Sequence, residues 1–152
     1  GNALCLAEGQ GRNGIHLAAL GHRVLVQDLS PVGLERALAL AQQRGVTIET
    51  ICCDLADFQP EAQSTDLVVA IWMHLPPQLR ASVHQQAVAA LRPGGILILE
   101  AYTPRQLELD RRPGRVLGII RPGAEPVGQL GVVGRGVWSR VRRVEPLELH
   151  GV

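Results

Sequence analysis

Three glycines near the start of the chain, Gly9, Gly11 and Gly14, have the spacing G-x-G-x-x-G and directly follow an apolar stretch and Glu8. Gly9 would allow a tight turn after a strand, and Gly11, which has no Cβ, would let the backbone approach a ligand closely. A helix expected from Asn13 would point its free backbone N–H groups into the same space. The spacing predicts a nucleotide-binding turn, although a glycine cluster alone is also typical of plain turns.

Acidic residues stand at the expected carboxyl ends of three apolar stretches: Glu8, Asp28 and Asp54. A fourth apolar stretch ends at Trp72. In a parallel sheet the carboxyl ends of the strands meet at one edge, and ligands bind there. We therefore expect these residues to line one rim of the sheet, beside the glycine turn.

Two kinds of nucleoside-containing ligand are compatible with such a turn. A dinucleotide such as NAD would place its pyrophosphate on the turn and a ribose at Asp28, but the Glu8 carboxylate would repel the pyrophosphate. S-adenosylmethionine (SAM) carries an ammonium and a sulfonium instead, and this positive charge suits a rim with several acids. The Tyr-Lys pair of an NAD(P)-linked oxidoreductase is also missing, because the chain contains no lysine.

Short apolar stretches alternate with segments of helical periodicity along most of the chain. Ser30 and Pro31 are typical of a helix start, and apolar residues then recur with helical spacing until Gly45. The alternation predicts an α/β fold, a Rossmann-like doubly wound mostly parallel sheet in a three-layer sandwich, with residues 66–72 as a central strand. The expected strands are residues 3–7, 24–27, 46–53, 66–72 and 96–101, and the expected helices are residues 13–20, 31–44 and 77–91.

The composition is that of an ordinary globular protein. The chain has 152 residues and a formal net charge of +1, which gives no indication of a nucleic-acid partner, and its apolar runs are too short to span a membrane. Cys5, Cys52 and Cys53 lie within apolar stretches, so we expect buried, reduced thiols rather than a metal site. These features predict a cytoplasmic protein that is a monomer or a weak dimer.

Together the motifs make this sequence similar to the class I SAM-dependent methyltransferases, and more narrowly to their tellurite-resistance-type branch. The resemblance covers residues 3–107. It implies SAM as the cofactor and methyl transfer as the reaction, with a small-molecule acceptor such as a thiol or a chalcogen oxyanion. The segments that carry it are Glu8 to Asn13, Asp28 with Ser30, Asp54-Leu55, His74-Leu75-Pro76, Leu91 to Gly95 and Leu99 to Tyr102.

The resemblance also implies which residues bind the two ends of the cofactor. The Glu8 side chain and the backbone of the Gly9-Gln10-Gly11 turn would hold the methionine part.

At the nucleoside end, Asp28, with Leu29 beside it, would accept hydrogen bonds from both ribose hydroxyls, since a carboxylate has two oxygens. Asp54 would accept from the adenine amino group, and the Leu55 backbone N–H would reach a ring nitrogen. An aspartate at the end of a strand is also a common turn cap, which is the structural alternative for Asp54.

The acceptor end of the site would follow the fourth strand. Ile71 and Trp72 would line the cofactor floor near the methyl group. His74 is the candidate catalytic residue, in an acid–base or substrate-contact role; the alternative is a histidine that is merely hydrogen-bonded at a strand end. Thiolates and chalcogen species are soft nucleophiles and need no general base, so the sequence leaves the methyl acceptor open.

The composition changes after Asp110. We expect a methyltransferase core over residues 1–110 and a Gly/Arg/Pro-rich region over residues 111–152, in which 116–120 and 137–144 form an edge hairpin or a poorly ordered tail. Members of the family usually have a helix before the first strand and two more strands at the end, and the chain departs from both patterns. Without a hairpin, strand 96–101 would be an exposed apolar edge. An NAD(P)-binding oxidoreductase domain and a truncated, non-catalytic cofactor-binding remnant are the alternatives.

Overall fold

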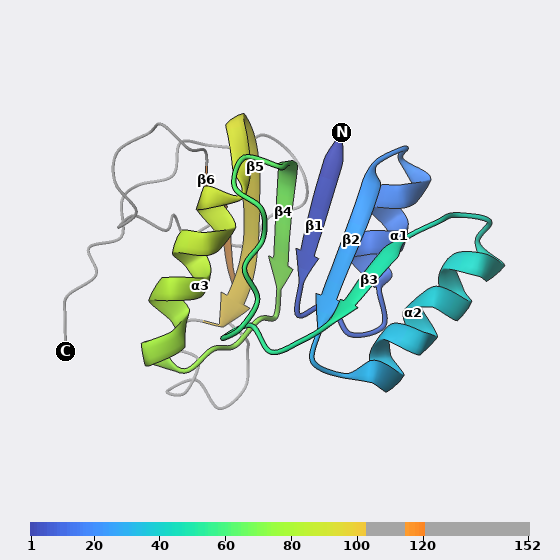
Figure 1. Ribbon diagram of the computed structural model, residues 1–152, viewed down its shortest axis with the longest axis horizontal. Coiled ribbons are helices and arrows are strands. Elements are labelled where there is room, and N and C mark those ends of the chain that lie inside the picture. The colour runs from blue at the N-terminus through green and yellow to red at the C-terminus, as the bar shows by residue number, and fades with distance from the viewer. Residues whose placement is uncertain (103–114, 121–152) are drawn as a thin grey trace.

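The computed structural model describes residues 1–102 and 115–120. For Tyr102 and for residues 115–120 it describes the backbone alone. The described residues form a six-stranded sheet with the order β3-β2-β1-β4-β5-β6 (Figure 1). The strands β1 to β5 are parallel, and β6 runs antiparallel to β5. The elements are β1 (Asn2–Leu6), α1 (Arg12–Ala19), β2 (Arg23–Asp28), α2 (Pro31–Gln43), β3 (Glu49–Cys52), β4 (Thr65–Ile71), α3 (Pro77–Ala89), β5 (Leu91–Tyr102) and β6 (Arg115–Ile120).

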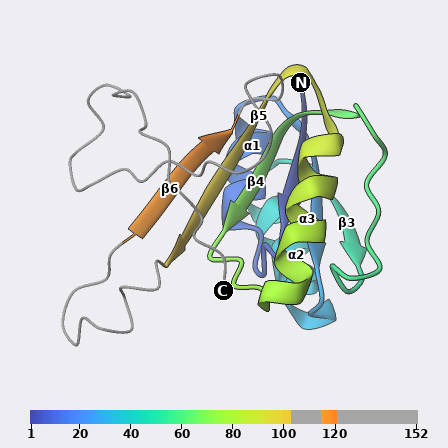
Figure 2. The ribbon, with the colours of Figure 1, turned by 90° about the vertical axis from the view of Figure 1, so that its left-hand side faces the viewer.

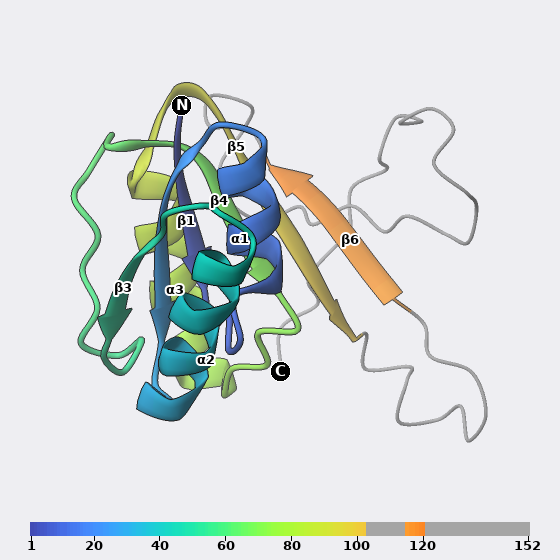
Figure 3. The same cartoon turned by 90° about the vertical axis from the view of Figure 1, so that its right-hand side faces the viewer.

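Helices cover both faces of the sheet. Figure 2 shows α3 in front of the sheet, and Figure 3, from the opposite side, shows α1 and α2 in front. Side chains alternate between the faces along β1: Leu4 and Leu6 belong to the core under α3, whereas Ala3 and Cys5 belong to the core under α1 and α2. The predicted Rossmann-like, three-layer fold with a mostly parallel sheet is confirmed.

The central position predicted for β4 is also confirmed, because β4 lies between β1 and β5. Val68 and Ala70 are almost inaccessible to solvent, as expected for a strand that is covered on both faces. The strand ends at Ile71, one residue earlier than expected. Trp72 has a φ of 61°, and this left-handed backbone conformation turns the chain out of the sheet.

Two other strand boundaries differ from the sequence prediction. β3 begins only at Glu49, because the Val46 N–H instead donates to the Ala41 carbonyl at 3.0 Å and closes the end of α2. β5 begins already at Leu91, which pairs with Thr65 before the register shifts. The tight turn expected around Gly94 is nevertheless present, since this glycine has a φ of 83°.

The start of α2 follows the sequence signals. The Ser30 hydroxyl accepts a hydrogen bond from the Gly33 N–H at 3.1 Å, and Pro31 is the first helical residue. α1 begins at Arg12, one residue earlier than expected, because Gly11 takes the N-cap position with a left-handed φ of 76°. Within residues 1–102 and 115–120, no helix is both long and apolar enough to cross a membrane.

The sequence after Asp110 contributes one described strand, β6, which corresponds to the predicted strand at residues 116–120. It pairs antiparallel with β5 from Leu97↔Ile120 to Tyr102↔Arg115, so the apolar edge expected on β5 is covered along this length. The proposed partner at residues 137–144 lies outside the described residues. The division of the chain at residue 110 stays a prediction.

Candidate active site

The carboxyl ends of β1 to β4 lie along one edge of the sheet, where the strand arrowheads point in Figure 1. Glu8 follows β1, Asp28 ends β2, Asp54 follows β3 and Trp72 follows β4. Because the strands are parallel, residues that are far apart in the sequence meet at this edge. The structure therefore brings the acids selected from the sequence to one rim.

Glu8 binds the start of α1 through its side chain. Its Oε1 accepts hydrogen bonds from the backbone N–H groups of Asn13 at 2.6 Å and Gly14 at 3.3 Å, and its Oε2 accepts from Asn13 Nδ2 at 3.1 Å. The first N–H groups of a helix have no partner within the helix and attract anions. The helix N-terminus, expected from the sequence to be free for a ligand, is thus occupied by a carboxylate of the chain itself.

Asp28 joins the glycine turn to the start of α2. Its Oδ2 accepts a hydrogen bond from the Gly9 N–H at 2.7 Å, and its Oδ1 accepts from the Ser30 N–H at 2.8 Å. An ionised carboxylate offers about four acceptor positions, so these two bonds leave capacity for hydroxyl donors. Two further residues predicted for the site, Gln10 and Leu29, are exposed beside it.

Asp54 and Leu55 form the turn after β3. Asp54 Oδ1 accepts from the Ala56 N–H at 2.8 Å, so the turn-capping role is present. Its Oδ2 has no hydrogen-bond donor within the described residues. Leu55 is buried, and its backbone N–H finds no acceptor in the same part of the chain. A donor and an acceptor are therefore available side by side at this end of the rim.

Gln27 is a rim residue that the sequence analysis missed. Its side chain is only 1% exposed, although it lies one residue before Asp28 in a strand of apolar neighbours. Its Oε1 accepts from the Ala7 N–H at 3.0 Å, and its Nε2 donates to the Cys53 carbonyl at 2.7 Å. A lone polar residue inside an apolar strand was the signal that could have identified it.

The structure gives two of the glycines a role in packing. A Cβ on Gly11 would lie 2.6 Å from the Ala37 Cβ on α2, and one on Gly14 would lie 2.7 Å from Val26 Cγ2 on β2. These two glycines therefore let α1 pack closely against α2 and β2. A Cβ on Gly9 would meet nothing within 4 Å, so Gly9 borders the open space at the rim.

We expect Gly11→Ala to reduce the free energy of unfolding by about 2–4 kcal/mol, from its left-handed backbone and the contact with Ala37. Gly9→Ala has only the backbone cost, about 1–2 kcal/mol. Urea denaturation of both variants measures the difference. Adding Ala37→Gly should return part of the stability lost in Gly11→Ala and should only destabilise Gly9→Ala; equal losses at the two glycines would contradict this packing argument.

The end of β4 carries an aromatic pair. The rings of Trp72 and His74 are stacked, with centroids 6.1 Å apart and planes at 23°. Trp72 is 36% exposed and His74 is exposed, while the Trp72 N–H donates to the Glu100 carbonyl at 2.8 Å. Ile71 is half-buried and packs against the core under α1 and α2. The predicted acceptor end therefore presents two stacked rings at its surface.

The three cysteines differ in exposure. Cys5 is buried and Cys53 is half-buried, but Cys52 is exposed, so the expectation of three buried thiols is wrong for Cys52. The reason is that β3 is an edge strand with little cover. Burial, and then the charge of Glu8, raise the pKa of the Cys5 thiol well above its usual range, and burial is the main cause of a raised pKa at Cys53. Neither is suited to act as a thiolate nucleophile at neutral pH.

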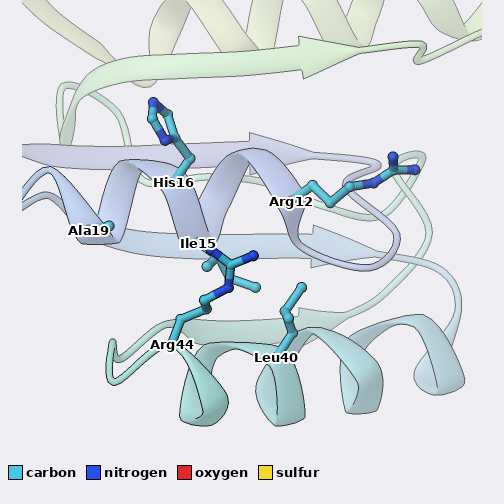
Figure 4. Close-up of a pocket in the computed structure, with 6 residues that line it drawn as sticks. All are labelled: Arg12, Ile15, His16, Ala19, Leu40 and Arg44. Carbon is cyan, nitrogen blue, oxygen red and sulfur yellow. The ribbon is translucent and has the colours of Figure 1, made fainter.

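A groove of about 260 Å³ lies between α1 and α2. Figure 4 shows the Arg44 side chain reaching from α2 toward Ile15 on α1, whereas Arg12 and His16 point in other directions. The basic side chains that line this groove therefore do not converge on one point. No ion pair to Arg12 is found within the described residues.

Known proteins similar to this chain include methyltransferases. Residues 3–95 match the model of a family described as a methyltransferase domain. The tRNA 5-carboxymethoxyuridine methyltransferase of Escherichia coli K12 is 33% identical over 106 residues, which are 65% of this chain and 39% of that protein. This chain thus spans less than half the length of that curated relative.

Two solved structures share the fold. The PH0226 protein from Pyrococcus horikoshii OT3 superposes with a TM-score of 0.64 and 28% identity, over 70% of this chain and 51% of that one. A TehB-like SAM-dependent methyltransferase from Corynebacterium glutamicum superposes with a TM-score of 0.58 and 25% identity, over 68% and 56% of the two chains. The tellurite-resistance-type branch suggested by the motifs is therefore among the structural neighbours.

The family match covers more than half of the chain and includes β1 to β4 with all the acids of the rim. The sheet order, the helices on both faces and the acidic rim agree with it. SAM is the cofactor of this class, as the motifs implied. The chain belongs to the class I SAM-dependent methyltransferases.

Proposed function

We propose that this chain binds SAM along the rim formed by the ends of β1 to β4 and transfers its methyl group to a small molecule with a soft nucleophile, such as a thiol or a chalcogen oxyanion. The observation that carries the binding proposal is the Glu8 carboxylate on the Asn13 and Gly14 N–H groups. A dinucleotide needs these N–H groups for its pyrophosphate. A cofactor that carries positive charge at this place does not need these N–H groups.

The nucleoside part of the cofactor fits the acids on β2 and β3. Asp28 would accept from the ribose hydroxyls with the acceptor positions that Gly9 and Ser30 leave free. Asp54 Oδ2 would accept from the adenine amino group, and the Leu55 N–H would donate to a ring nitrogen. This donor–acceptor order matches the edge of adenine, which offers an amino donor beside a ring acceptor.

The methionine part would lie between the Gly9-Gln10-Gly11 turn and the end of β4. Gly9 borders open space there, and in this arrangement Glu8 acts mainly by fixing the turn from behind. Ile71 and Trp72 would form the floor near the methyl group. SAM supplies a methyl carbon that its sulfonium already activates for in-line displacement, so the chain needs only to orient the acceptor and exclude water. His74 is the candidate for contacting the acceptor.

A second acceptor class is favoured by one observation, the similarity to the E. coli tRNA 5-carboxymethoxyuridine methyltransferase. An RNA nucleobase is therefore the alternative acceptor. The net charge of +1 argues for the small molecule, because the phosphate backbone of RNA usually meets a strongly basic surface.

The test is a thermal-shift titration with S-adenosylhomocysteine, NAD and NADP, followed by transfer of a labelled methyl group to thiols, tellurite, selenite and tRNA. At a hundredfold excess over the dissociation constant, binding adds about 2.7 kcal/mol to the stability. For a chain of this size the melting temperature should rise by about 5–10 °C with S-adenosylhomocysteine alone. A rise with NAD only would contradict the proposal, and binding without transfer to any acceptor would favour a non-catalytic remnant.

A further inference from the structure

We propose that Gln27 is a positioning residue that couples the two ends of the cofactor site. This inference rests on the proposed function, which places the methionine part at the turn after β1 and the adenine at the turn after β3. Gln27 lies in β2, between these two strands. Its side chain joins the turns that follow them, and because it is buried it would act on the cofactor only through those turns.

The hydrogen bonds define this link. Gln27 Oε1 accepts from the Ala7 N–H, and the Gln27 backbone carbonyl accepts from the Glu8 N–H at 3.2 Å. On the other side, Gln27 Nε2 donates to the Cys53 carbonyl, and the Cys53 N–H donates to the Asp28 carbonyl at 3.2 Å. The turn after β1 and the turn after β3 are therefore both fastened to the last two residues of β2.

The chain at both ends of this link needs such support. Ala7 has a left-handed φ of 49°, which an alanine adopts only when its surroundings enforce it. Cys53 lies just beyond the short strand β3, which is at the edge of the described sheet. Glu8 and Asp54 follow these residues directly, so their positions depend on the same hydrogen bonds.

The amide is the suitable group for this task. Its oxygen only accepts and its nitrogen only donates, so one planar group can satisfy an N–H on one side and a carbonyl on the other. Because the side chain is 1% exposed, water cannot replace either bond cheaply, and loss of the amide leaves buried backbone groups unpaired. The consequence for binding is specific: a ligand that spans both turns depends on their separation, whereas a ligand at one turn does not.

The experiment compares two ligands with the wild type, Gln27→Met and a matched control. S-adenosylhomocysteine spans both ends of the site, whereas methylthioadenosine lacks the amino-acid group. Methionine has nearly the shape of glutamine but neither donor nor acceptor. The control is Val26→Ala, which removes buried volume from the neighbouring position of the same strand, where Val26 is 0% exposed. Binding is measured by calorimetry, and stability by urea denaturation.

We expect Gln27→Met to weaken the binding of S-adenosylhomocysteine about tenfold, which is the order of one lost hydrogen-bonded constraint. The affinity for methylthioadenosine should change by less than about twofold. Val26→Ala should reduce stability but change neither affinity. Unchanged affinity for S-adenosylhomocysteine in Gln27→Met, or equal weakening of both ligands, would overturn the coupling role. If the wild type bound neither ligand, the proposed function itself would fail, which is a distinct result.

A second variant serves if Gln27→Met does not fold. Gln27→Glu keeps an acceptor for the Ala7 N–H, and its protonated carboxyl can also donate to the Cys53 carbonyl, whereas the ionised form cannot. Burial favours the neutral form, so the affinity of Gln27→Glu for S-adenosylhomocysteine should fall as the pH rises through the pKa of this carboxyl. The neighbouring carboxylates of Glu8, Asp28 and Asp54 are the same in both proteins, so the wild type is the reference; identical pH profiles would overturn the proposal.

Discussion

Replacing Asp28 by alanine is expected to weaken S-adenosylhomocysteine binding by about a hundredfold or more. In the proposed complex this carboxylate accepts from both ribose hydroxyls, and hydrogen bonds to a charged group contribute about 1.5–3 kcal/mol each. A loss of about 2.7 kcal/mol corresponds to a hundredfold change in the dissociation constant. Calorimetric titration of the purified variant measures the effect.

The same substitution also removes the bonds to the Gly9 and Ser30 N–H groups. The loss of affinity therefore has two causes, the missing contact with the ligand and a displaced loop, and these must be separated. Asp28→Asn helps to do so. Its amide oxygen can keep one of the two backbone bonds, but its nitrogen faces a second N–H donor, so we expect an intermediate loss of affinity. Glu35→Ala removes an exposed acid from α2 and is the matched control, with no expected change. Affinity that survives in Asp28→Ala would place the ribose elsewhere.

The fold could be predicted from the sequence because its signals are local. Alternation of apolar strands and amphipathic helices determines the layers, and the Ser30-Pro31 signal sets the start of α2 correctly. The two boundary errors have different causes. β5 starts early because Leu91 pairs with Thr65 across the sheet, and this distant contact cannot be recognised from the residues next to Leu91 in the sequence. β3 starts late for a local reason, because the Val46 N–H donates to the Ala41 carbonyl and closes the end of α2.

The candidate site shows the same division. The strand-end positions of Glu8, Asp28 and Asp54 follow from the strand pattern, since parallel strands bring their carboxyl ends together. The hydrogen-bond partners of these side chains do not follow from the strand pattern. The spacing of the glycines predicts the turn correctly. The close contact of Gly11 with the Ala37 Cβ could not be predicted, because Ala37 belongs to another helix. Gln27 was missed because its two partners, Ala7 and Cys53, lie in the turns that follow two other strands.

Glu8→Ala is expected to have the second large effect, on both stability and ligand choice. It removes the acceptor for the Asn13 and Gly14 N–H groups, and loss of a helix-capping acceptor costs about 1–2 kcal/mol. The glycine turn then loses its support, so we expect S-adenosylhomocysteine to bind at least about tenfold more weakly, a free-energy loss of about 1.4 kcal/mol. Urea denaturation and calorimetry measure the two losses separately.

The exposed helix N-terminus should at the same time become available to anions. Inorganic pyrophosphate and NAD, which we expect the wild-type carboxylate to exclude by charge and by occupancy, should gain affinity in Glu8→Ala. Glu8→Gln keeps an acceptor oxygen without the charge, and should therefore preserve most of the stability. Asn13→Ala removes only the 3.1 Å bond to Oε2 and is the control for the side-chain contact. If Glu8→Ala binds pyrophosphate no better than the wild type does, repulsion by Glu8 is not the reason that this site prefers SAM to a dinucleotide.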